Sequence, residues 1–182
     1  MAVLDASPII YYSRIGELYW LLGFYRSLKT TGSIVRETVD DARGLNKPGV
    51  SAIEMALSKG WISVSDLSDD EKDSARNIAK SEGIEPEDAE IIVLAMNEND
   101  IVVTNDRMLR LAALAHGLKV HWATTPILIG CRENRITVAQ AKSMINRLVD
   151  AGLRVKSQTL VTIYTVIEHF RKLELSYSFS KR

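Results

Sequence analysis

Cysteine is almost absent from this chain, because Cys131 is the only one among 182 residues. A single cysteine cannot form a disulfide bond within the chain. Cys131 ends an apolar run that begins at Pro126, where packing is a more ordinary role for a cysteine than nucleophilic attack. The three histidines lack both metal-ligand spacing and a cysteine partner, so we expect them to be structural or exposed.

An excess of charge of either sign is also missing. The chain has 23 basic and 23 acidic residues, which give a formal net charge of zero. This balance argues against a protein that binds nucleic acid tightly and without specificity, because such proteins are usually basic. It does not exclude an enzyme that acts on nucleic acid, since metal ions offset part of the negative charge of clustered carboxylates.

Long hydrophobic runs are the third absence. No apolar stretch approaches the roughly 20 residues that a membrane-spanning helix needs. The N-terminus has no basic region followed by an apolar stretch and a cleavage site. We therefore expect no membrane segment and a cytoplasmic location.

What the chain does contain is an alternation of short β-like runs with helical runs, which predicts a parallel sheet covered by helices. The expected strands are residues 3–4, 28–31, 61–64, 101–104 and 119–121. After Trp122 the pattern is helical only. We predict a three-layer α/β/α domain with a parallel sheet of four to five strands in residues 1–122. Residues 123–182 are expected to be a helical extension packed on the same domain.

An aspartate, Asp5, stands where the first strand should end. Ser7 and Pro8 follow it and predict a helix start, with Ser7 as cap and Pro8 at the first helical position. Ligands of α/β proteins bind beyond the carboxyl ends of the strands. A carboxylate at this joint is therefore either a helix cap or part of a site.

Four acidic residues share this ambiguity: Asp5, Glu37, Asp88 and Asp106. Asp106 is well placed to be a helix N-cap, worth about 1 kcal/mol. Asp88 lies in the first turn of its helix, where the helix dipole favours a negative charge by roughly 0.3–1 kcal/mol. Taken singly, each residue has an ordinary structural explanation.

Taken together, the four carboxylates are expected to meet. Asp5 and Asp106 each follow a strand, so they project at one edge of the sheet if the first and fourth strands are neighbours. Asp88 shares a helical stripe with apolar residues that should face the sheet, and Glu37 follows the second strand. Mutual repulsion of such carboxylates is relieved by Mg²⁺ or Mn²⁺, which suit an all-oxygen site. A site of this kind can activate a water for attack on a phosphodiester.

The carboxylates occur in four short segments: Asp5-Ala6-Ser7-Pro8-Ile9-Ile10, Val35-Arg36-Glu37, Asp88-Ala89-Glu90-Ile91-Ile92 and Val102-Val103-Thr104-Asn105-Asp106-Arg107. In this order they resemble the PIN-domain family of metal-dependent nucleases. The resemblance covers roughly residues 1–122. It is closest to a prokaryotic subgroup whose chains open with Asp-Ala-Ser-Pro, several of which are toxin-like in the manner of VapC.

The resemblance implies a function and a set of roles. The implied reaction is hydrolysis of RNA by metal-activated water, which leaves a 5′-phosphate and a 3′-hydroxyl. The implied ligands of Mg²⁺ or Mn²⁺ are Asp5, Asp88, Asp106 and, as a further ligand or supporting group, Glu37. The implied orienting groups are Ser7 and either Thr104 or Asn105. Many relatives form dimers and toxin members are silenced by an antitoxin, so a homodimer and an antitoxin partner are also expected.

One departure from the subgroup leaves the third ligand open. Some members have Gly-Glu-Ala-Glu where this chain has Glu87-Asp88-Ala89-Glu90. Either Asp88 or Glu90 can therefore take that role. We favour Asp88, because the wider family has aspartate there.

Two other classes of phosphoryl-transfer protein use an aspartate after the first or third strand, and the sequence departs from both. A haloacid-dehalogenase-like phosphatase needs Asp-x-Asp after its first strand, and the third position here is Ser7. A response-regulator receiver needs a lysine after its fifth strand, where this chain has His121-Trp122. A non-catalytic module with a vestigial acidic site, and an RNA-processing nuclease without a toxin role, are the remaining alternatives.

Two further features bear on RNA binding. The first helical region is rich in aromatic residues, which can stack on nucleobases but more often form a core or a dimer interface. They are Tyr11, Tyr12, Tyr19, Trp20 and Tyr25. Arg110, one helical turn after Asp106, is either a phosphate contact or the partner of Asp106 in an ion pair.

Overall fold

The structure is a computed structural model that describes residues 1–40, 43 and 48–179, with side chains described up to residue 170. The chain divides into two compact units, Met1–Ala123 and Thr124–Arg182. Residues 44–49, where Gly44, Pro48 and Gly49 predict a loop, lie mostly outside the described residues.

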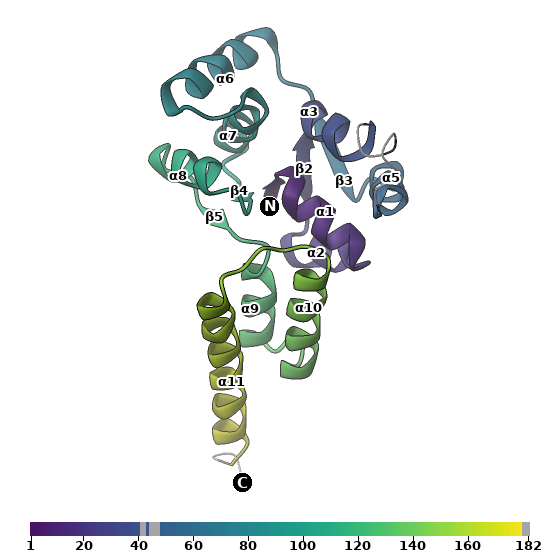
Figure 1. Cartoon of the computed structure of the whole chain (residues 1–182), viewed down its shortest axis with the longest axis vertical. Coiled ribbons are helices and arrows are strands. Elements are labelled where there is room, and N and C mark those ends of the chain that lie inside the picture. The colour runs from purple at the N-terminus through teal and green to yellow at the C-terminus, as the bar shows by residue number, and fades with distance from the viewer. Residues whose placement is uncertain (41–42, 44–47, 180–182) are drawn as a thin grey trace. The chain divides into compact units, whose positions relative to one another are not determined.

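Five strands form one all-parallel sheet in the first unit, with the order β3-β2-β1-β4-β5 (Figure 1). The strands are β1 (Ala2–Leu4), β2 (Leu28–Thr31), β3 (Ile62–Ser65), β4 (Ile101–Val103) and β5 (Val120–His121). This confirms the predicted parallel α/β fold, with each strand within one residue of its expected position. The first and fourth strands are neighbours, as the argument for convergence required.

Helices flank the sheet. Those of the first unit are α1 (Ala6–Arg14), α2 (Leu18–Tyr25), α3 (Gly32–Val35), the π-helical turn η1 (Arg36–Asp40), α5 (Val50–Ser58), α6 (Asp69–Glu82), α7 (Pro86–Glu98) and α8 (Arg107–Ala115). α3 and α5 contact β3, whereas α7 contacts β1, β2 and β4, and α8 contacts β5.

The direction of strand addition reverses at β1. From β1 the chain moves outward through β2 to β3, then returns to the other side of β1 for β4 and β5. Because crossover connections between parallel strands are right-handed, the helices of the two halves cover opposite faces of the sheet. The carboxyl ends of β1 and β4 therefore border the switch point, where α/β proteins bind their ligands.

The register of the strands fixes which residues meet at that edge. Leu4 pairs with Val103, and Val103 pairs with His121. The residues that follow are Asp5, Thr104 and Trp122, so these three leave neighbouring strands at the same level.

The core lies between the sheet and its helices. β1 is completely buried, as the central strand of a parallel sheet should be. Ile91, Ile92 and Ala95 of α7 are also fully buried. The apolar stripe predicted for this helix therefore faces the core, and Asp88 stands at the N-terminal end of it.

Two helix starts differ from the predictions. α1 is capped by Asp5 rather than Ser7, because an Asp5 oxygen accepts the Ala6 N–H while the Ser7 hydroxyl donates to Asp5. The sequence also predicts Ser33 as the cap of a helix that carries Ile34 and Val35, but α3 is capped by Thr31, since the Thr31 hydroxyl accepts the Ile34 N–H. In both cases the last residue of the preceding strand, or the one after it, already provides the capping oxygen.

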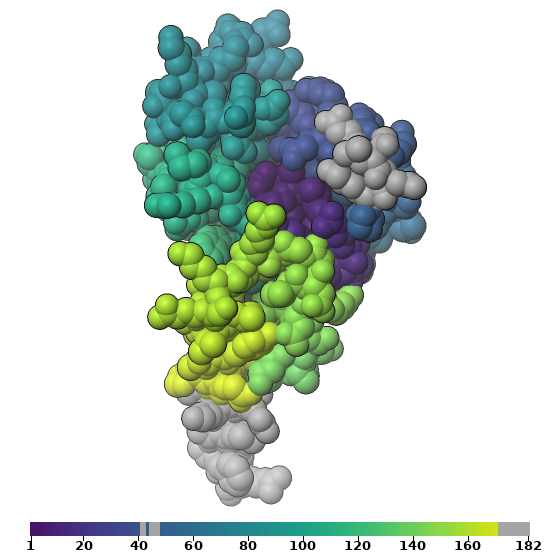
Figure 2. Space-filling model, viewed as in Figure 1, coloured from purple at the N-terminus to yellow at the C-terminus, as the bar shows by residue number. Residues whose placement is uncertain are grey.

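The second unit consists of helices α9 (Thr125–Arg132), α10 (Val138–Asp150) and α11 (Ser157–Phe179), each in contact with the other two. The described surfaces of α10 and α11 lie side by side in the space-filling view (Figure 2), and Lys142 of α10 forms an ion pair with Glu168 of α11. Cys131 is 1% exposed, which confirms its predicted packing role. In the part of the chain that the structure describes, no helix is both long and apolar enough to cross a bilayer.

Candidate active site

Asp5 is a buried carboxylate at the carboxyl end of β1, with 6% of its surface exposed. Its Oδ1 accepts the Ala6 N–H at 2.5 Å. Its Oδ2 accepts two hydroxyl groups, from Ser7 at 2.9 Å and from Thr104 at 2.7 Å. Three donors therefore hold this carboxylate in one orientation.

The Thr104 hydroxyl links Asp5 to the next acidic residue. While it donates to Asp5, its oxygen accepts the backbone N–H of Asp106 at 2.9 Å. Thr104 is fully buried, so both hydrogen bonds are shielded from water. The ends of β1 and β4 are thus coupled by one side chain.

The charge on Asp5 is costly. Burial raises the pKa of its carboxyl group, and the nearby charge of Asp106 raises it further, while hydrogen bonds from Thr104, Ser7 and Ala6 oppose the shift. The ion pairs of the described residues include none with Asp5. A buried carboxylate without a basic partner is an unfavourable arrangement unless a cation offsets it.

Asp106 serves as the N-cap of α8, as predicted. Its Oδ1 accepts the N–H groups of Met108 at 2.7 Å and Leu109 at 2.8 Å. The side chain is exposed, and the hydrogen bonds within the described part of the chain use only Oδ1. The cap therefore leaves Oδ2 able to bind another group.

Asp88 lies in the first turn of α7, behind Pro86 at the helix start, and is partly buried. Its pKa is raised to about 7, first by burial and then by the charges of Asp5, Asp106, Glu37 and Glu85, in that order. Carboxylates from β1, α8 and η1 are therefore within electrostatic reach of Asp88. A metal site shared by the four carboxylates stays a prediction.

Glu37 reaches this group from a π-helical turn. It lies on η1, and its side chain is exposed. Single turns of π-helix are rare and occur often at functional sites. The sequence predicts only a helix around Glu37, because a π-helical turn has no distinct residue pattern.

Glu90, the alternative to Asp88, is two residues further along α7. Two residues turn a helix by about 200°, so the two side chains leave on nearly opposite sides. Glu90 is not among the charges that raise the pKa of Asp88, whereas Glu85 is. Glu85 was not predicted as part of this group, although its place beside the helix start is visible in the sequence.

Asn105 ties the loop after β4 to its neighbours. Its backbone N–H donates to the Ser7 hydroxyl at 3.3 Å, and its Oδ1 accepts the Ala123 N–H at 3.1 Å. Its Nδ2 group is buried, and no hydrogen-bond partner for it exists among the described residues. Ser7, Thr104 and Asn105 are thus all connected to the carboxylates or to each other.

The oxygen atoms of the acidic groups suit a hard divalent cation, but the groups stand too far apart to share one ion. All the acidic groups are oxygen donors, which Mg²⁺ and Mn²⁺ prefer. Within the ranges that the structure describes, no three His, Cys, Asp or Glu side chains stand close enough to share one ion. Asp106 and Glu37 are the exposed members of the group.

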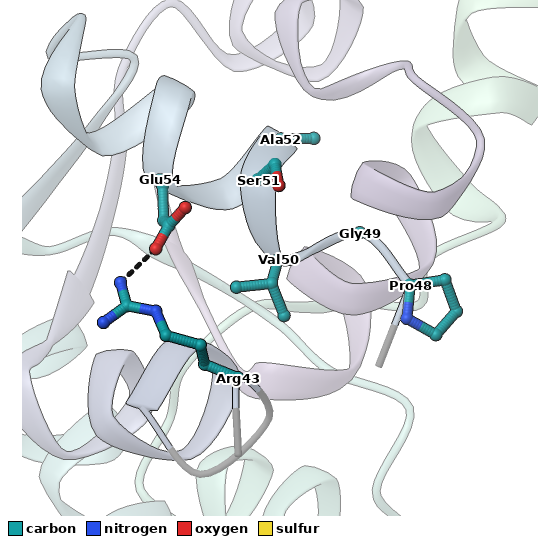
Figure 3. Close-up of a pocket in the computed structure, with 7 residues that line it drawn as sticks. All are labelled: Arg43, Pro48, Gly49, Val50, Ser51, Ala52 and Glu54. Carbon is teal, nitrogen blue, oxygen red and sulfur yellow. Dashed lines mark hydrogen bonds and ion pairs between the residues drawn. The ribbon is translucent and has the colours of Figure 1, made fainter. Parts of the chain in front are cut away.

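A separate pocket of about 420 Å³ lies beside the start of α5 (Figure 3). An ion pair between Arg43 and Glu54 lines it, together with residues Pro48 to Ala52. None of the four carboxylates lines this pocket. It therefore adds nothing to the acidic group at the sheet edge.

Comparison with known proteins identifies a family. A family model described as PIN domain, DUF3368, matches residues 1–169, which is more of the chain than the sequence motifs covered. No curated protein matches. Among solved structures, the crystal structure of PAE2754 from Pyrobaculum aerophilum shares 18% identity, with a TM-score of 0.48, over 65% of this chain and 89% of that chain.

Proposed function

The chain belongs to the PIN-domain family, whose members are generally nucleases, and from this membership we propose that it is an endoribonuclease that uses Mg²⁺ or Mn²⁺. The observation that supports the proposal is geometric: Asp5 and Asp106 follow neighbouring strands at the switch point of the sheet, and the Thr104 hydroxyl joins the Asp5 carboxylate to the Asp106 backbone. Carboxylates gathered in this way are held there against their own repulsion, which a divalent cation would offset.

In the proposed site, Asp5, Asp88 and Asp106 would hold the metal ion, with Glu37 as a further ligand. The ion would lower the pKa of a water molecule and stabilise the charge that develops on the phosphodiester. Ser7 and Thr104 keep the Asp5 carboxylate in one orientation through their hydroxyl groups. Thr104 also holds the backbone of Asp106, so the two ends of the site keep their spacing.

The proposal is confined to RNA cleavage. A toxin role, an antitoxin partner and a homodimer come from the resemblance of the sequence to one subgroup, and they remain hypotheses at that level. An RNA-processing nuclease without a toxin role would use the same carboxylates and the same ion.

The test is cleavage of a mixed RNA pool during a titration with Mn²⁺. Wild type should cleave in a metal-dependent way, and Asp106→Asn and Asp5→Asn should each lower the rate by about 10²-fold or more, since an ion of this kind supplies several kcal/mol of charge stabilisation. Glu87→Gln is the matched control, because Glu87 is an exposed acidic residue beside Asp88 that does not act on its pKa. Its rate should equal that of wild type.

The third ligand is tested in the same assay. Asp88→Asn should abolish cleavage and Glu90→Gln should not, whereas the reverse result would move the ligand to Glu90. Equal cleavage by wild type and by Asp106→Asn would contradict the proposed site. Absence of both cleavage and Mn²⁺ binding would favour the non-catalytic module.

A further inference from the structure

Trp122 is a large aromatic side chain at the same edge of the sheet as the carboxylates. It follows β5 directly, and the register places it level with Thr104 and Asp5 on the neighbouring strands. Its side chain is 41% exposed. With strands about 4.8 Å apart, its backbone lies roughly 10 Å from that of Asp5, two strand spacings along the edge.

A cation accompanies the ring. The guanidinium carbon of Arg110 lies 5.7 Å from the centre of the Trp122 ring. Arg110 belongs to the first turns of α8, where its backbone N–H donates to the Asp106 carbonyl at 3.2 Å. The ion pairs of the described residues do not join Arg110 to Asp106, so the contact with Trp122 replaces the pairing considered from the sequence.

The backbone on both sides of Trp122 is fixed by side chains from other elements. The Tyr12 hydroxyl donates to the Ala123 carbonyl at 2.7 Å, and the Asn105 side chain accepts the Ala123 N–H. Before the tryptophan, His121 is hydrogen bonded to the Tyr25 hydroxyl at 2.8 Å. An aromatic ring on so fixed a support loses little conformational freedom when a ligand stacks on it.

Three of the five aromatic residues of the first helical region have other roles. Tyr12 is completely buried and Tyr25 is 6% exposed, and both use their hydroxyl groups for the hydrogen bonds just described. Tyr19 is exposed but packs on Trp61 with ring centres 5.0 Å apart. Trp61 precedes β3, so this pair stands at the opposite edge of the sheet from the carboxylates.

We propose that Trp122, with Arg110 beside it, is a stacking site for a base of single-stranded RNA whose backbone reaches the carboxylates. The proposal rests on the proposed nuclease function and adds to it a residue that binds the substrate; the base must be unpaired, because a base within a duplex has no free face to stack. The Arg110 guanidinium supplies a positive charge for a phosphate next to the stacked base. Stacking would then contribute to the affinity for RNA alongside charge, in a protein whose net charge is zero.

The experiment measures binding separately from cleavage. In the Asp106→Asn background with Mn²⁺ present, fluorescence anisotropy would follow binding of a labelled oligoadenylate and of a ribose-phosphate chain of equal length without bases. Adding Trp122→Ala should weaken oligoadenylate binding about 5- to 150-fold, the equivalent of about 1–3 kcal/mol. Binding of the base-free chain should be unchanged, and Trp122→Phe should retain most of the affinity.

Trp61→Ala is the matched control, since Trp61 also lies under a cation, Lys59 at 5.4 Å, but at the other edge of the sheet. It should not change the affinity for oligoadenylate. Equal affinity of the Trp122→Ala and parent proteins for oligoadenylate would overturn the stacking site, even if wild type cleaves RNA normally. Equal loss for both probes would also overturn it, because the defect would then lie in folding or in phosphate contacts. If Asp106→Asn still cleaves the probe, the proposed nuclease site fails and the stacking result stands by itself.

Discussion

Asp88 is the carboxylate on which the charges of the other acidic groups act together, and its titration should be visible in the stability of the protein. Its pKa is about 7 in the folded chain, against 3.8 for an ordinary aspartate. The folded state therefore binds more protons than the unfolded state between these values. Its stability relative to the unfolded chain falls as pH rises through 7.

We predict that Asp88→Asn stabilises the metal-free protein most at about pH 8, progressively less as the pH falls, and little at about pH 3.5, below the pKa of the unfolded chain. The gain should be on the order of 1–2 kcal/mol, because solvent screens part of the shift for a partly exposed group. Denaturant unfolding in EDTA at several pH values would measure it, with Glu87→Gln as control. A gain that does not depend on pH would contradict the electrostatic account.

At the level of residues, strand ends were enough to predict that Asp5 and Asp106 would meet. Neither the link through Thr104 nor the contact between Arg110 and Trp122 was predictable in that way. Both depend on side-chain conformations across strands, and a threonine or a tryptophan after a strand has many possible partners. The sequence alone suggested an ion pair between Arg110 and Asp106, because spacing along one helix can be read from the sequence. Contacts between different elements cannot.

At the level of elements, the approach to α5 depends on a close backbone contact. Gly49 has φ +99°, and a Cβ atom there would lie 2.5 Å from the Ser13 hydroxyl oxygen and 3.2 Å from Arg14 Cγ of α1. Gly60 also has a positive φ, +67°, but a Cβ atom there would meet nothing within 4 Å. Substitution of Gly60 by alanine therefore introduces backbone strain alone, whereas the same substitution at Gly49 introduces backbone strain and steric overlap.

We predict that Gly60→Ala lowers the free energy of unfolding by about 1–2 kcal/mol, from backbone strain alone. Gly49→Ala should cost about 1–3 kcal/mol more, because the Ser13 hydroxyl has to give up its hydrogen bond to the Ile10 carbonyl or the two helices have to separate. Urea unfolding would measure both. Ser13→Ala should recover part of the extra loss, and no recovery would show that Ser13 is not the obstacle.

Helix positions were predictable because caps, prolines and glycines mark them locally. Ser68 and Thr137, which are typical helix caps, begin α6 and α10, each in a capping box with the residue three positions on. The predicted caps of α1 and α3 were wrong, because two residues able to cap the helix stand close together in each case. The hydrogen bonds that decide between them form only once the strand end is in place.

At the level of the whole molecule, we retain as a proposal the expectation that the C-terminal helices are part of one domain. The family model spans both units, since it runs from residue 1 to residue 169. The resemblance seen in the sequence ended near residue 122, because the helices beyond it have an apolar periodicity but no motif of catalytic residues. Periodicity predicts a helix but not its partner.

The three tryptophans make this proposal testable. Trp20, Trp61 and Trp122 all lie in the first unit, so their fluorescence reports its unfolding, whereas far-UV circular dichroism reports both units. Ile167 of α11 is fully buried, and Ile167→Ala should cost about 2–5 kcal/mol. If the chain is one domain, the two signals change together and both midpoints shift.

Val161→Ala is the control, because Val161 is 64% exposed on the same helix and its loss should change stability by no more than about 0.5 kcal/mol. A shift in circular dichroism without a shift in fluorescence would show that the units unfold independently.

Every hydrogen bond to the Asp5 carboxylate is donated by its partner. This limits which substitution can remove the activity of the site without disturbing the fold. Asp5 receives only donors, from Ala6 on one oxygen and from Ser7 and Thr104 on the other. An asparagine there must turn its NH₂ group toward at least one of these donors. Asp5→Asn therefore removes a charge and also places an N–H group against another hydrogen-bond donor. Asp106 receives both its donors on a single oxygen, which an asparagine carbonyl can replace. Asp106→Asn is therefore the isosteric probe of this centre, whereas a defect at Asp5 mixes catalysis with folding.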